Sequence, residues 1–181
     1  MNVLIEAEEI REAVETLGQR LAVDYAGKML TVVGVLTGSV MLLADLVRAM
    51  NLPLRISLVR ASSYRGTATR PGELEIDKQL LDDVSGRDVL LVDDIFDSGR
   101  TLDGLLETIR GHHPASLRSA VLLWKIGRCE VAIEPDYHCF RIPDVFVVGY
   151  GLDYNGEYRY LPHIAGLDDQ DLVEPGDTGT R

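Results

Sequence analysis

The stretch Val89–Leu102, which reads VLLVDDIFDSGRTL, decides the fold class of this chain. It opens with four consecutive apolar residues, a pattern typical of a strand buried on both faces of a parallel sheet. Three aspartates follow within five positions, and a small polar turn comes after them. From Leu102 onward, apolar residues recur with the three-and-four spacing of a helix packed on one side. The stretch is therefore predicted to be a strand, an acidic loop and a helix start.

The acidic loop lies where α/β proteins bind ligands. Open α/β sheets place ligands at the carboxyl ends of their strands. The N–H groups of the turn Ser98–Thr101 would point toward the start of the next helix, an arrangement that favours a phosphate. Carboxylates beside an anion site are explained by a sugar phosphate, because the acids can take hydroxyl groups or a metal while the turn takes the phosphate. The alternative is a solvated acidic turn.

Strands and helices alternate along the rest of the chain. This order predicts an α/β fold with a mostly parallel sheet and helices on both faces. The expected helices run from Glu6 to Tyr25, from the Thr37-Gly38-Ser39 turn to Met50, and from Leu102 to Ile109. Further strands are expected at Thr31–Leu36, Leu54–Val59, Glu73–Ile76, Ala120–Trp124 and Val145–Val148, and Ala61–Gly72 is expected to be a mobile surface loop.

Length and composition set outer limits on function. The 181 residues predict one domain over residues 1–167, followed by an acidic, disordered tail at 168–181. A net charge of −11 argues against nucleic acid as the main partner, because binding a phosphate backbone needs a basic surface. The two cysteines fit neither a zinc site nor a disulfide framework. With no apolar run of membrane-spanning length and an acidic N-terminus, the chain is expected in the cytoplasm, away from membranes.

Four segments together resemble one protein family. VLLVDDIFDSGRTL resembles the phosphoribosyl diphosphate (PRPP) signature of type I phosphoribosyltransferases. Val35–Ser39 resembles their pyrophosphate loop, and Ala61–Tyr64 resembles the start of their flexible catalytic loop. Phe146–Asn155, with Arg159 after it, resembles the hood of hypoxanthine-guanine phosphoribosyltransferases. The chain is thereby identified as a member of the 6-oxopurine branch, with the resemblance running from the first helix to about Leu161.

The resemblance implies a fold and a reaction. The fold would be that of type I phosphoribosyltransferases, with a hood formed mainly by residues 126–167. Hypoxanthine, and guanine as well, would displace pyrophosphate from PRPP with Mg²⁺ as cofactor, in a homodimer or homotetramer. Two alternatives stay open: a xanthine-preferring enzyme, and a non-catalytic regulator or sensor that binds PRPP or a nucleotide with the same fold.

The resemblance also assigns roles to the residues of the acidic stretch. Asp93 and Asp94 would hold the ribose hydroxyls and a Mg²⁺ ion. Asp97 would be the catalytic acid/base, exchanging a proton with N7 of the purine; its alternative role is to cap the following helix. The three acids would bind PRPP together with the 5′-phosphate turn, whose members are Ser98, Gly99, Arg100 and Thr101.

Residues outside this stretch would complete the site. Lys125 would meet the exocyclic oxygen of the base, or else be an ordinary exposed lysine. Phe146 would stack on the purine, unless it is simply a core residue, and Val147 would offer backbone groups to the base edge. The remaining assignments are Thr37, Gly38 and Arg159 for pyrophosphate, Asp153 for a second Mg²⁺, and Ser63 and Tyr64 for a lid.

Two residues depart from the family pattern. The acid pair, often Glu-Asp in this branch, is Asp93-Asp94 here, and Thr37 stands where a lysine is common. The shorter Asp93 side chain would reach less far than a glutamate. At Thr37 the family contact is largely through backbone N–H, and the peptide bond equivalent to Leu36–Thr37 can be cis in the family.

Overall fold

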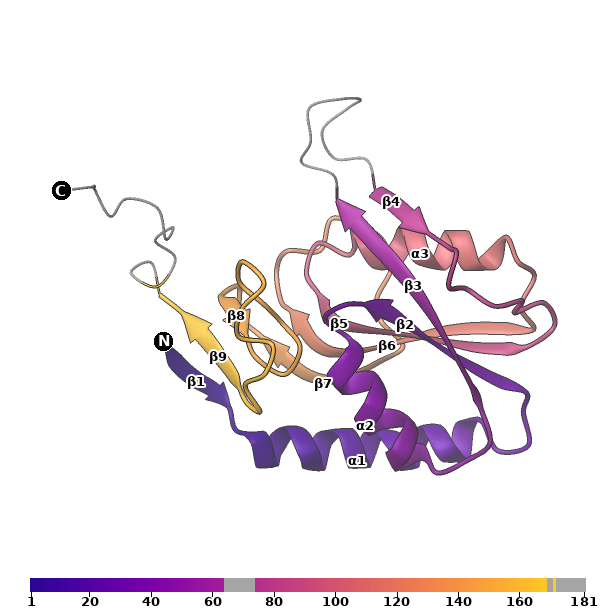
Figure 1. Cartoon of the computed structure of the whole chain (residues 1–181), viewed down its shortest axis with the longest axis horizontal. Helices are drawn as coiled ribbons and strands as arrows, with labels where there is room; N and C mark the ends of the chain where they lie inside the picture. The colour runs from indigo at the N-terminus through magenta and orange to yellow at the C-terminus, as the bar shows by residue number, and fades with distance from the viewer. Residues whose placement is uncertain (64–73, 169–170, 172–181) are drawn as a thin grey trace.

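A six-stranded sheet forms the centre of the computed structural model, which describes residues 1–63, 74–168 and 171 (Figure 1). The strand order is β4-β3-β2-β5-β6-β7. Neighbouring strands are parallel from β3 to β7, and β4 is an antiparallel edge strand, so the predicted mostly parallel sheet is confirmed. The strands are β2 (Leu30–Leu36), β3 (Arg55–Ser63), β4 (Leu74–Asp77), β5 (Asp88–Phe96), β6 (Ser116–Lys125) and β7 (Tyr137–Ile142).

Helices cover both faces of this sheet, as the alternation of elements predicts. Helices α1 (Ala7–Asp24) and α2 (Val40–Met50) lie on one face, and α3 (Arg100–Arg110) lies on the other (Figure 1). Each helix buries one stripe of apolar residues, which in α3 consists of Leu102, Leu105, Leu106 and Ile109. The start of α1 is fixed by the Glu6 N–H, which donates to the Glu9 carboxylate at 2.9 Å.

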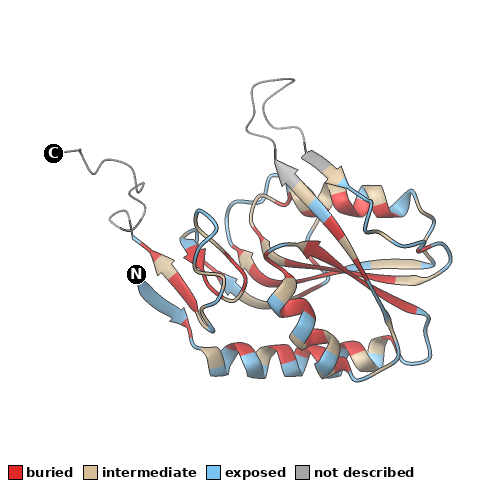
Figure 2. Cartoon of the chain, viewed as in Figure 1, coloured by how far each residue is buried: buried red, intermediate tan, exposed pale blue. Residues whose placement is uncertain are grey.

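The middle parts of the central strands are mostly apolar because both of their faces are covered (Figure 2). In β5, Leu90 and Val92 pack into the core beneath α1 and α2. Val89 and Leu91 point to the opposite face and pack with α3. All four side chains are fully buried, and β5 continues through Asp93 and Asp94, which were expected in the loop after it, so these two acids are held by a rigid strand.

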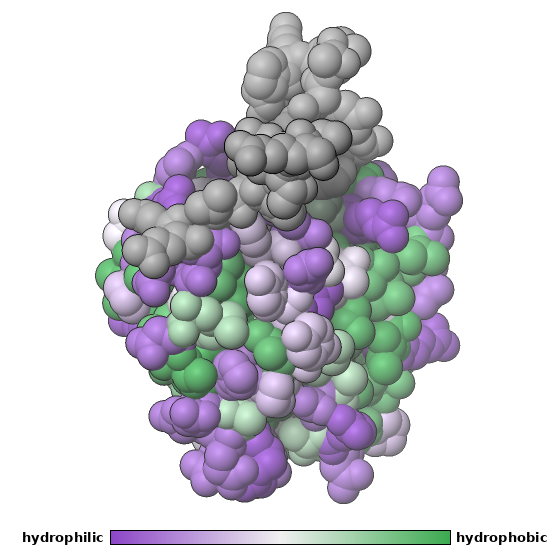
Figure 3. Space-filling model, turned by 60° about the vertical axis from the view of Figure 1, so that its left-hand side comes forward, coloured by the Kyte–Doolittle hydropathy of each residue, from purple (hydrophilic) through white to green (hydrophobic). Residues whose placement is uncertain are grey.

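A second, three-stranded antiparallel sheet joins the two ends of the described chain. Its order is β1 (Asn2–Ile5), β9 (Ile164–Leu167) and β8 (Phe146–Val148). The N-terminal strand therefore adds to the region in which residues 126–167 were expected to form a hood, whereas β7, within that range, pairs with β6 in the large sheet. Figure 3 turns this side of the molecule forward and shows apolar side chains among polar ones at its surface.

Strands β1, β7 and β9 were missed because their sequences lack a clear period. Most of β1 is exposed, and β7 mixes buried Tyr137 with the half-exposed His138.

The expected loop at Ala61–Gly72 is wrong at its start, since Ala61–Ser63 continue β3 and pair with β4. Residues 64–73 and most of the expected tail lie outside the described residues, although the Met1 ammonium donates to Asp171 at 2.6 Å. Within the described parts, no helix is long and apolar enough to cross a membrane.

Helices α1 and α2 touch at a glycine, which yields a test of the fold. A Cβ atom added to Gly18 would lie 2.5 Å from the Ala49 Cβ and 2.9 Å from the Ala49 carbonyl carbon. Replacing a helical glycine by alanine normally stabilises a helix by up to about 1 kcal/mol. We expect Gly18→Ala to lower the free energy of unfolding instead, by about 1–3 kcal/mol, because the helices must move apart.

The measurement is urea unfolding of Gly18→Ala beside Gln19→Ala, a change on the exposed side of the same helix. The Gln19 variant should unfold like the parent protein. A Gly18 variant as stable as the parent, or more so, would show that the helix contact is not tight.

Candidate functional site

A cavity of about 310 Å³ lies at the carboxyl ends of β2 and β5. Parallel strands end at this edge of the sheet, where ligands bind in open α/β folds. Ten of the residues selected from the sequence line it: Thr37, Gly38, Asp93, Asp94, Asp97, Ser98, Gly99, Thr101, Asp153 and Arg159. Its apolar walls lie within the segments matched by the family resemblance, but these residues were given no role of their own, because they look like ordinary core: Val35, Leu36, Ala61, Ile95, Phe96 and Leu102.

Asp93, which is buried, and Asp94, which is partly buried, form a pair of carboxylates in the cavity lining. The Asp94 N–H donates to the Asp93 carboxylate at 2.9 Å. Burial raises the pKa of Asp93 well above its usual range, and the neighbouring Asp94 charge raises it further. Burial also raises the pKa of Asp94, against the opposing effect of the hydrogen bond with Asp93 and of the Arg159 charge. A cationic or hydroxyl-bearing ligand would compensate these two charges.

These carboxylates suit a magnesium ion that keeps water and substrate ligands better than they suit a metal coordinated only by protein side chains. Among the described residues, no group of three or more His, Cys, Asp and Glu side chains is arranged to hold a metal. Magnesium is usually bound by one or two carboxylates, with the remaining positions filled by water and substrate oxygens. Asp93, Asp94 and Asp153, which all line the cavity, supply hard oxygen donors of this kind.

The loop after β2 is pressed against the acid pair. The Leu36–Thr37 peptide bond is cis. A Cβ atom added to Gly38 would lie 1.5 Å from Asp94 Oδ2, so only glycine fits between the loop and this carboxylate. Gly151, with φ of +100°, approaches the same loop from the other side, and a Cβ atom there would lie 2.1 Å from the Gly38 carbonyl oxygen.

Asp153 and Arg159 form a pair on the pyrophosphate side expected from the sequence. The Arg159 guanidinium lies 2.6 Å from Asp153 Oδ1 and also donates to the Gly151 carbonyl at 2.6 Å. Asp153 Oδ2 accepts a hydrogen bond from the Gly156 N–H at 2.8 Å. The guanidinium is thereby oriented at the cavity wall, where it can pair with an anion.

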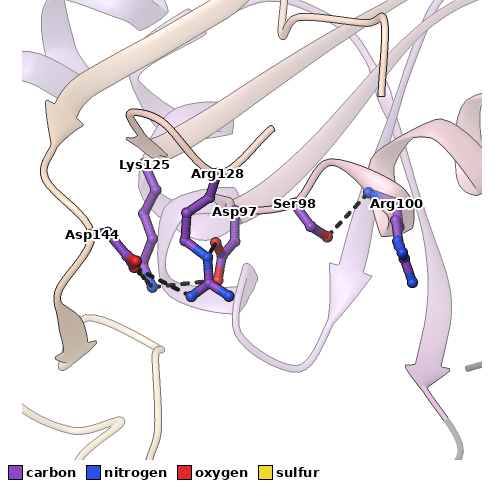
Figure 4. Close-up of polar contacts among 6 residues, drawn as sticks. All are labelled: Asp97, Ser98, Arg100, Lys125, Arg128 and Asp144. Atoms are coloured by element: carbon purple, nitrogen blue, oxygen red, sulfur yellow. Dashed lines mark hydrogen bonds and ion pairs between the residues drawn. The ribbon is translucent and has the colours of Figure 1, made fainter. Parts of the chain in front are cut away.

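The turn between β5 and α3 has the backbone needed for a phosphate. Gly99 is the N-cap of α3 and has φ of +84°, and a Cβ atom there would meet the Val131 side chain at 2.4 Å. Ser98 and Thr101 line the cavity, whereas the Arg100 side chain is 68% exposed and pairs with Glu130 at 2.5 Å. Figure 4 shows the Arg100 guanidinium directed away from Asp97. Its side chain is therefore not brought into the site, although its N–H belongs to the turn.

Asp97 is paired with two cations rather than with the start of α3 (Figure 4). Its Oδ2 lies 3.3 Å from the Lys125 Nζ, and its Oδ1 lies 3.3 Å from the Arg128 Nε. Asp144 completes the group, with its Oδ1 3.7 Å from Lys125 and 3.2 Å from Arg128. The capping role considered for Asp97 is thus wrong, and Lys125, 7% exposed, is not an ordinary surface lysine.

Arg128 and Asp144 were missed by the sequence reasoning. Each is a single charged residue in a loop, and no spacing connects them to the acidic stretch. Their positions became evident only when the fold brought the loop after β6 beside the loop before β8. We call Asp97, Lys125, Arg128 and Asp144 the four-charge cluster.

The expected base-binding residues lie next to this cluster. Phe146 begins β8 two residues after Asp144, and its ring packs edge-on against Tyr154 with 5.5 Å between the ring centroids. Phe146 is 41% exposed, so it is not a core residue, and Val147 is buried. Neither residue lines the 310 Å³ cavity. Of the expected lid residues, Ser63 ends β3 and Tyr64 lies outside the described residues.

Comparison with known proteins identifies relatives across nearly the whole chain. Residues 4–155 match the phosphoribosyl transferase domain family. A hypoxanthine-guanine phosphoribosyltransferase of Streptococcus pneumoniae is 42% identical over 168 residues, which cover 93% of each protein. One from Staphylococcus aureus is 41% identical over 165 residues, covering 91% of this chain and 92% of the relative.

Solved structures agree with these matches. A hypoxanthine phosphoribosyltransferase from Staphylococcus aureus is similar with a TM-score of 0.88 and 39% identity, covering 95% of this chain and 94% of its own. A Trypanosoma cruzi hypoxanthine phosphoribosyltransferase in a ternary complex with substrates has a TM-score of 0.87 and 36% identity, covering 95% and 97%.

The contact between Gly38 and Asp94 yields a test of the site. In Gly38→Ala the new methyl group must push the loop away from Asp94. Because small displacements of a binding group are costly, we expect pyrophosphate affinity to fall at least about tenfold. Isothermal titration calorimetry with pyrophosphate measures this change.

Gly111→Ala is the matched control, since Gly111 has φ of −61° and the nearest atom to an added Cβ is a carbonyl oxygen at 3.2 Å. Its affinity should equal that of the parent protein. Equal affinities for the Gly38 and Gly111 variants would contradict a ligand-binding role for the loop.

Proposed function

Since the chain belongs to the hypoxanthine-guanine phosphoribosyltransferase family, we propose that it transfers the phosphoribosyl group of PRPP to hypoxanthine and to guanine. The products are IMP or GMP, and pyrophosphate. The observation that carries this proposal is the position of Asp97, which lies between a phosphate turn and a buried lysine. An acid/base group is then next to a cation suited to a 6-oxo group.

The cavity supports a division of PRPP among three sets of groups. The turn Ser98–Thr101 leads into the N-terminus of α3, and its N–H groups would bind the 5′-phosphate. Asp93 and Asp94, in the cavity lining, would accept hydrogen bonds from the ribose hydroxyls. Arg159, which lines the cavity together with Thr37 and Gly38, would pair with the pyrophosphate. Each charge of the substrate then faces a group of suitable chemistry.

The proposed transfer is a displacement at C1 of the ribose. A purine nitrogen forms the new bond to C1 as the bond between C1 and the pyrophosphate oxygen breaks, and pyrophosphate leaves with the electron pair. Asp97 accepts the proton from N7 of the base, in the carboxylate form that pairs with Lys125. Positive charge builds up on the ribose, so catalysis rests mainly on positioning and electrostatic stabilisation.

Lys125 accounts for the proposed choice of base. An ammonium group donates hydrogen bonds and accepts none. It therefore favours the 6-oxo group of hypoxanthine or guanine over the 6-amino group of adenine. Phe146, half exposed beside the cluster, offers an apolar face on which the purine can stack.

Magnesium is the proposed cofactor. Asp93 and Asp94 would hold one ion together with the ribose hydroxyls, and Asp153 would hold a second on the pyrophosphate side. When bound, magnesium would offset the negative charge of the pyrophosphate as it leaves. We place this activity in a single domain over residues 1–167, working in the cytoplasm as a homodimer or homotetramer, as the family resemblance implies.

A panel of bases tests the activity. Purified protein with PRPP and Mg²⁺ is given hypoxanthine, guanine, xanthine or adenine, and nucleoside monophosphates are separated by chromatography. We expect IMP and GMP to form and AMP not to form, because Lys125 cannot accept a hydrogen bond from the adenine amino group. Xanthine as the best substrate would favour the alternative specificity. No product from any 6-oxopurine would contradict the proposed function.

Replacement of Asp97 tests its role in proton transfer. Asp97→Asn keeps the shape of the side chain but removes the proton acceptor, so kcat should fall about 10²- to 10⁴-fold. Affinity for PRPP should change much less. Asp103→Asn, an acid in the first turn of α3 that does not line the cavity, is the control and should keep full activity. Equal rates for the Asp97 variant and the parent would remove Asp97 from the acid/base role.

A further inference from the structure

The loop after β6 is fastened to the site at two points. At its start, the Ile126 N–H donates to the Ile142 carbonyl at 2.9 Å. Further along, the Glu130 N–H donates to the Ser98 carbonyl at 2.9 Å, and the Glu130 carboxylate pairs with Arg100. Arg128 lies between these two anchors. Its side chain is thus carried by a loop that is tied to the phosphate turn on one side and to β7 on the other.

Arg128 and Lys125 bind the same two carboxylates. Arg128 lies 3.3 Å from Asp97 and 3.2 Å from Asp144, and Lys125 lies 3.3 Å and 3.7 Å from them. Figure 4 shows the four side chains converging from three segments of the chain. Two positive and two negative charges share one small volume, and each carboxylate has two cationic partners.

The double pairing resolves a conflict in the proposed function. Lys125 must donate to the 6-oxo group of the base, yet its side chain is 7% exposed and its ammonium already faces two carboxylates. Moving the ammonium away takes one cation from each carboxylate, and Asp97 and Asp144, whose side chains are 37% and 51% exposed, would attract it back unless another cation stays with them. Arg128 can bind two carboxylates at once, because its planar guanidinium carries five N–H donors in a rigid fork.

We propose that Arg128 is a positioning residue that frees Lys125 for the base. It holds Asp97 and Asp144 when the Lys125 ammonium turns to the 6-oxo group of the incoming purine. Asp97 then stays oriented for the N7 proton, and Asp144 does not draw Lys125 back. This role rests on the proposed function, since it concerns the base that the chain is proposed to use.

Loss of Arg128 should therefore affect the base more than PRPP. In Arg128→Gln, Asp97 and Asp144 have Lys125 as their remaining partner in the cluster, so Lys125 is held away from the purine. The KM for hypoxanthine should rise about tenfold, the effect of one lost charge-assisted hydrogen bond. The KM for PRPP should stay close to the parent value, because the proposed PRPP contacts lie in the cavity that Arg128 does not line.

A second substitution should restore what the first one removes. In Arg128→Gln/Asp144→Asn, one of the two carboxylates that hold Lys125 has lost its charge. We expect the hypoxanthine KM of this double variant to return most of the way to the parent value. Asp144→Asn alone should not raise that KM, and Arg128→Lys, which keeps the charge but loses the fork, should fall between parent and Arg128→Gln. If Arg128 only stabilised the fold, the effects of Arg128→Gln and Asp144→Asn on the hypoxanthine KM would add instead of cancelling.

The experiment is a steady-state kinetic comparison of these variants with hypoxanthine and with PRPP. Arg11→Gln is the control, because Arg11 also bridges two carboxylates, of Glu8 and Glu15, and is 52% exposed against 48% for Arg128. It should match the parent in both KM values. Fluorescence of Trp124, the only tryptophan of the chain and the neighbour of Lys125, monitors IMP binding and folding of each variant.

The outcomes separate the two proposals. An active parent whose Arg128→Gln variant keeps the parental hypoxanthine KM would overturn the role of Arg128 and leave the proposed function intact. A double variant no better than Arg128→Gln would also overturn it. A parent protein inactive with every 6-oxopurine would contradict the proposed function, and the role of Arg128 would fall with it. If Arg128→Gln does not fold, Arg128→Lys with and without Asp144→Asn makes the same comparison.

Discussion

Three segments of the chain pack tightly against one another at the carboxyl ends of β2 and β5, and the pocket depends on this contact. They are the loop at Gly38, the end of β5 at Asp94 and the segment at Gly151. Gly38 lies against the Asp94 carboxylate, and Gly151 lies against the Gly38 carbonyl oxygen. A side chain at either glycine would separate the segments. The Tyr150 hydroxyl donates to Asp45 on α2 at 2.5 Å, which ties the outermost segment to the core. Because the segments cannot spread apart, Arg159 is kept at the same cavity as the acid pair.

The parallel register explains why the second half of the site forms beside the first. Strands β5 and β6 pair with Phe96 opposite Trp124, so the next residues, Asp97 just after β5 and Lys125 at the end of β6, follow side by side. Although 28 positions separate them in sequence, their side chains need only turn toward one another to reach 3.3 Å. An acid and a cation at the ends of adjacent parallel strands are thus brought together by topology, and the loops add Arg128 and Asp144 to them.

The sequence predicted those elements of the fold in which the local residue pattern agrees with the place of the element in the sheet. Val89–Leu102 forms a strand, a turn and a helix in the predicted order, because its apolar run is buried on both faces of the sheet, although the strand continues through Asp93 and Asp94 to Phe96. Strands β1 and β9 could not be recognised, since each is four residues long and depends on pairing between the two ends of the described chain. Arg128 and Asp144 were equally hidden, because a lone charge in a loop gains its meaning only from the charges that folding places around it.

The three aspartates at the carboxyl end of β5 show why residue type alone does not assign chemistry. Asp93 and Asp94 sit at the end of a buried strand, and burial raises the pKa of both, so their charges call for a ligand that brings hydroxyls or a cation. Asp97, three residues farther on, has left the sheet and meets Lys125 and Arg128. Lys125 and Arg128 balance the charge of Asp97, so this carboxylate needs no ligand for compensation and can exchange a proton with one. One short stretch therefore supplies two environments, and the difference between them separates binding of the sugar from handling of the proton.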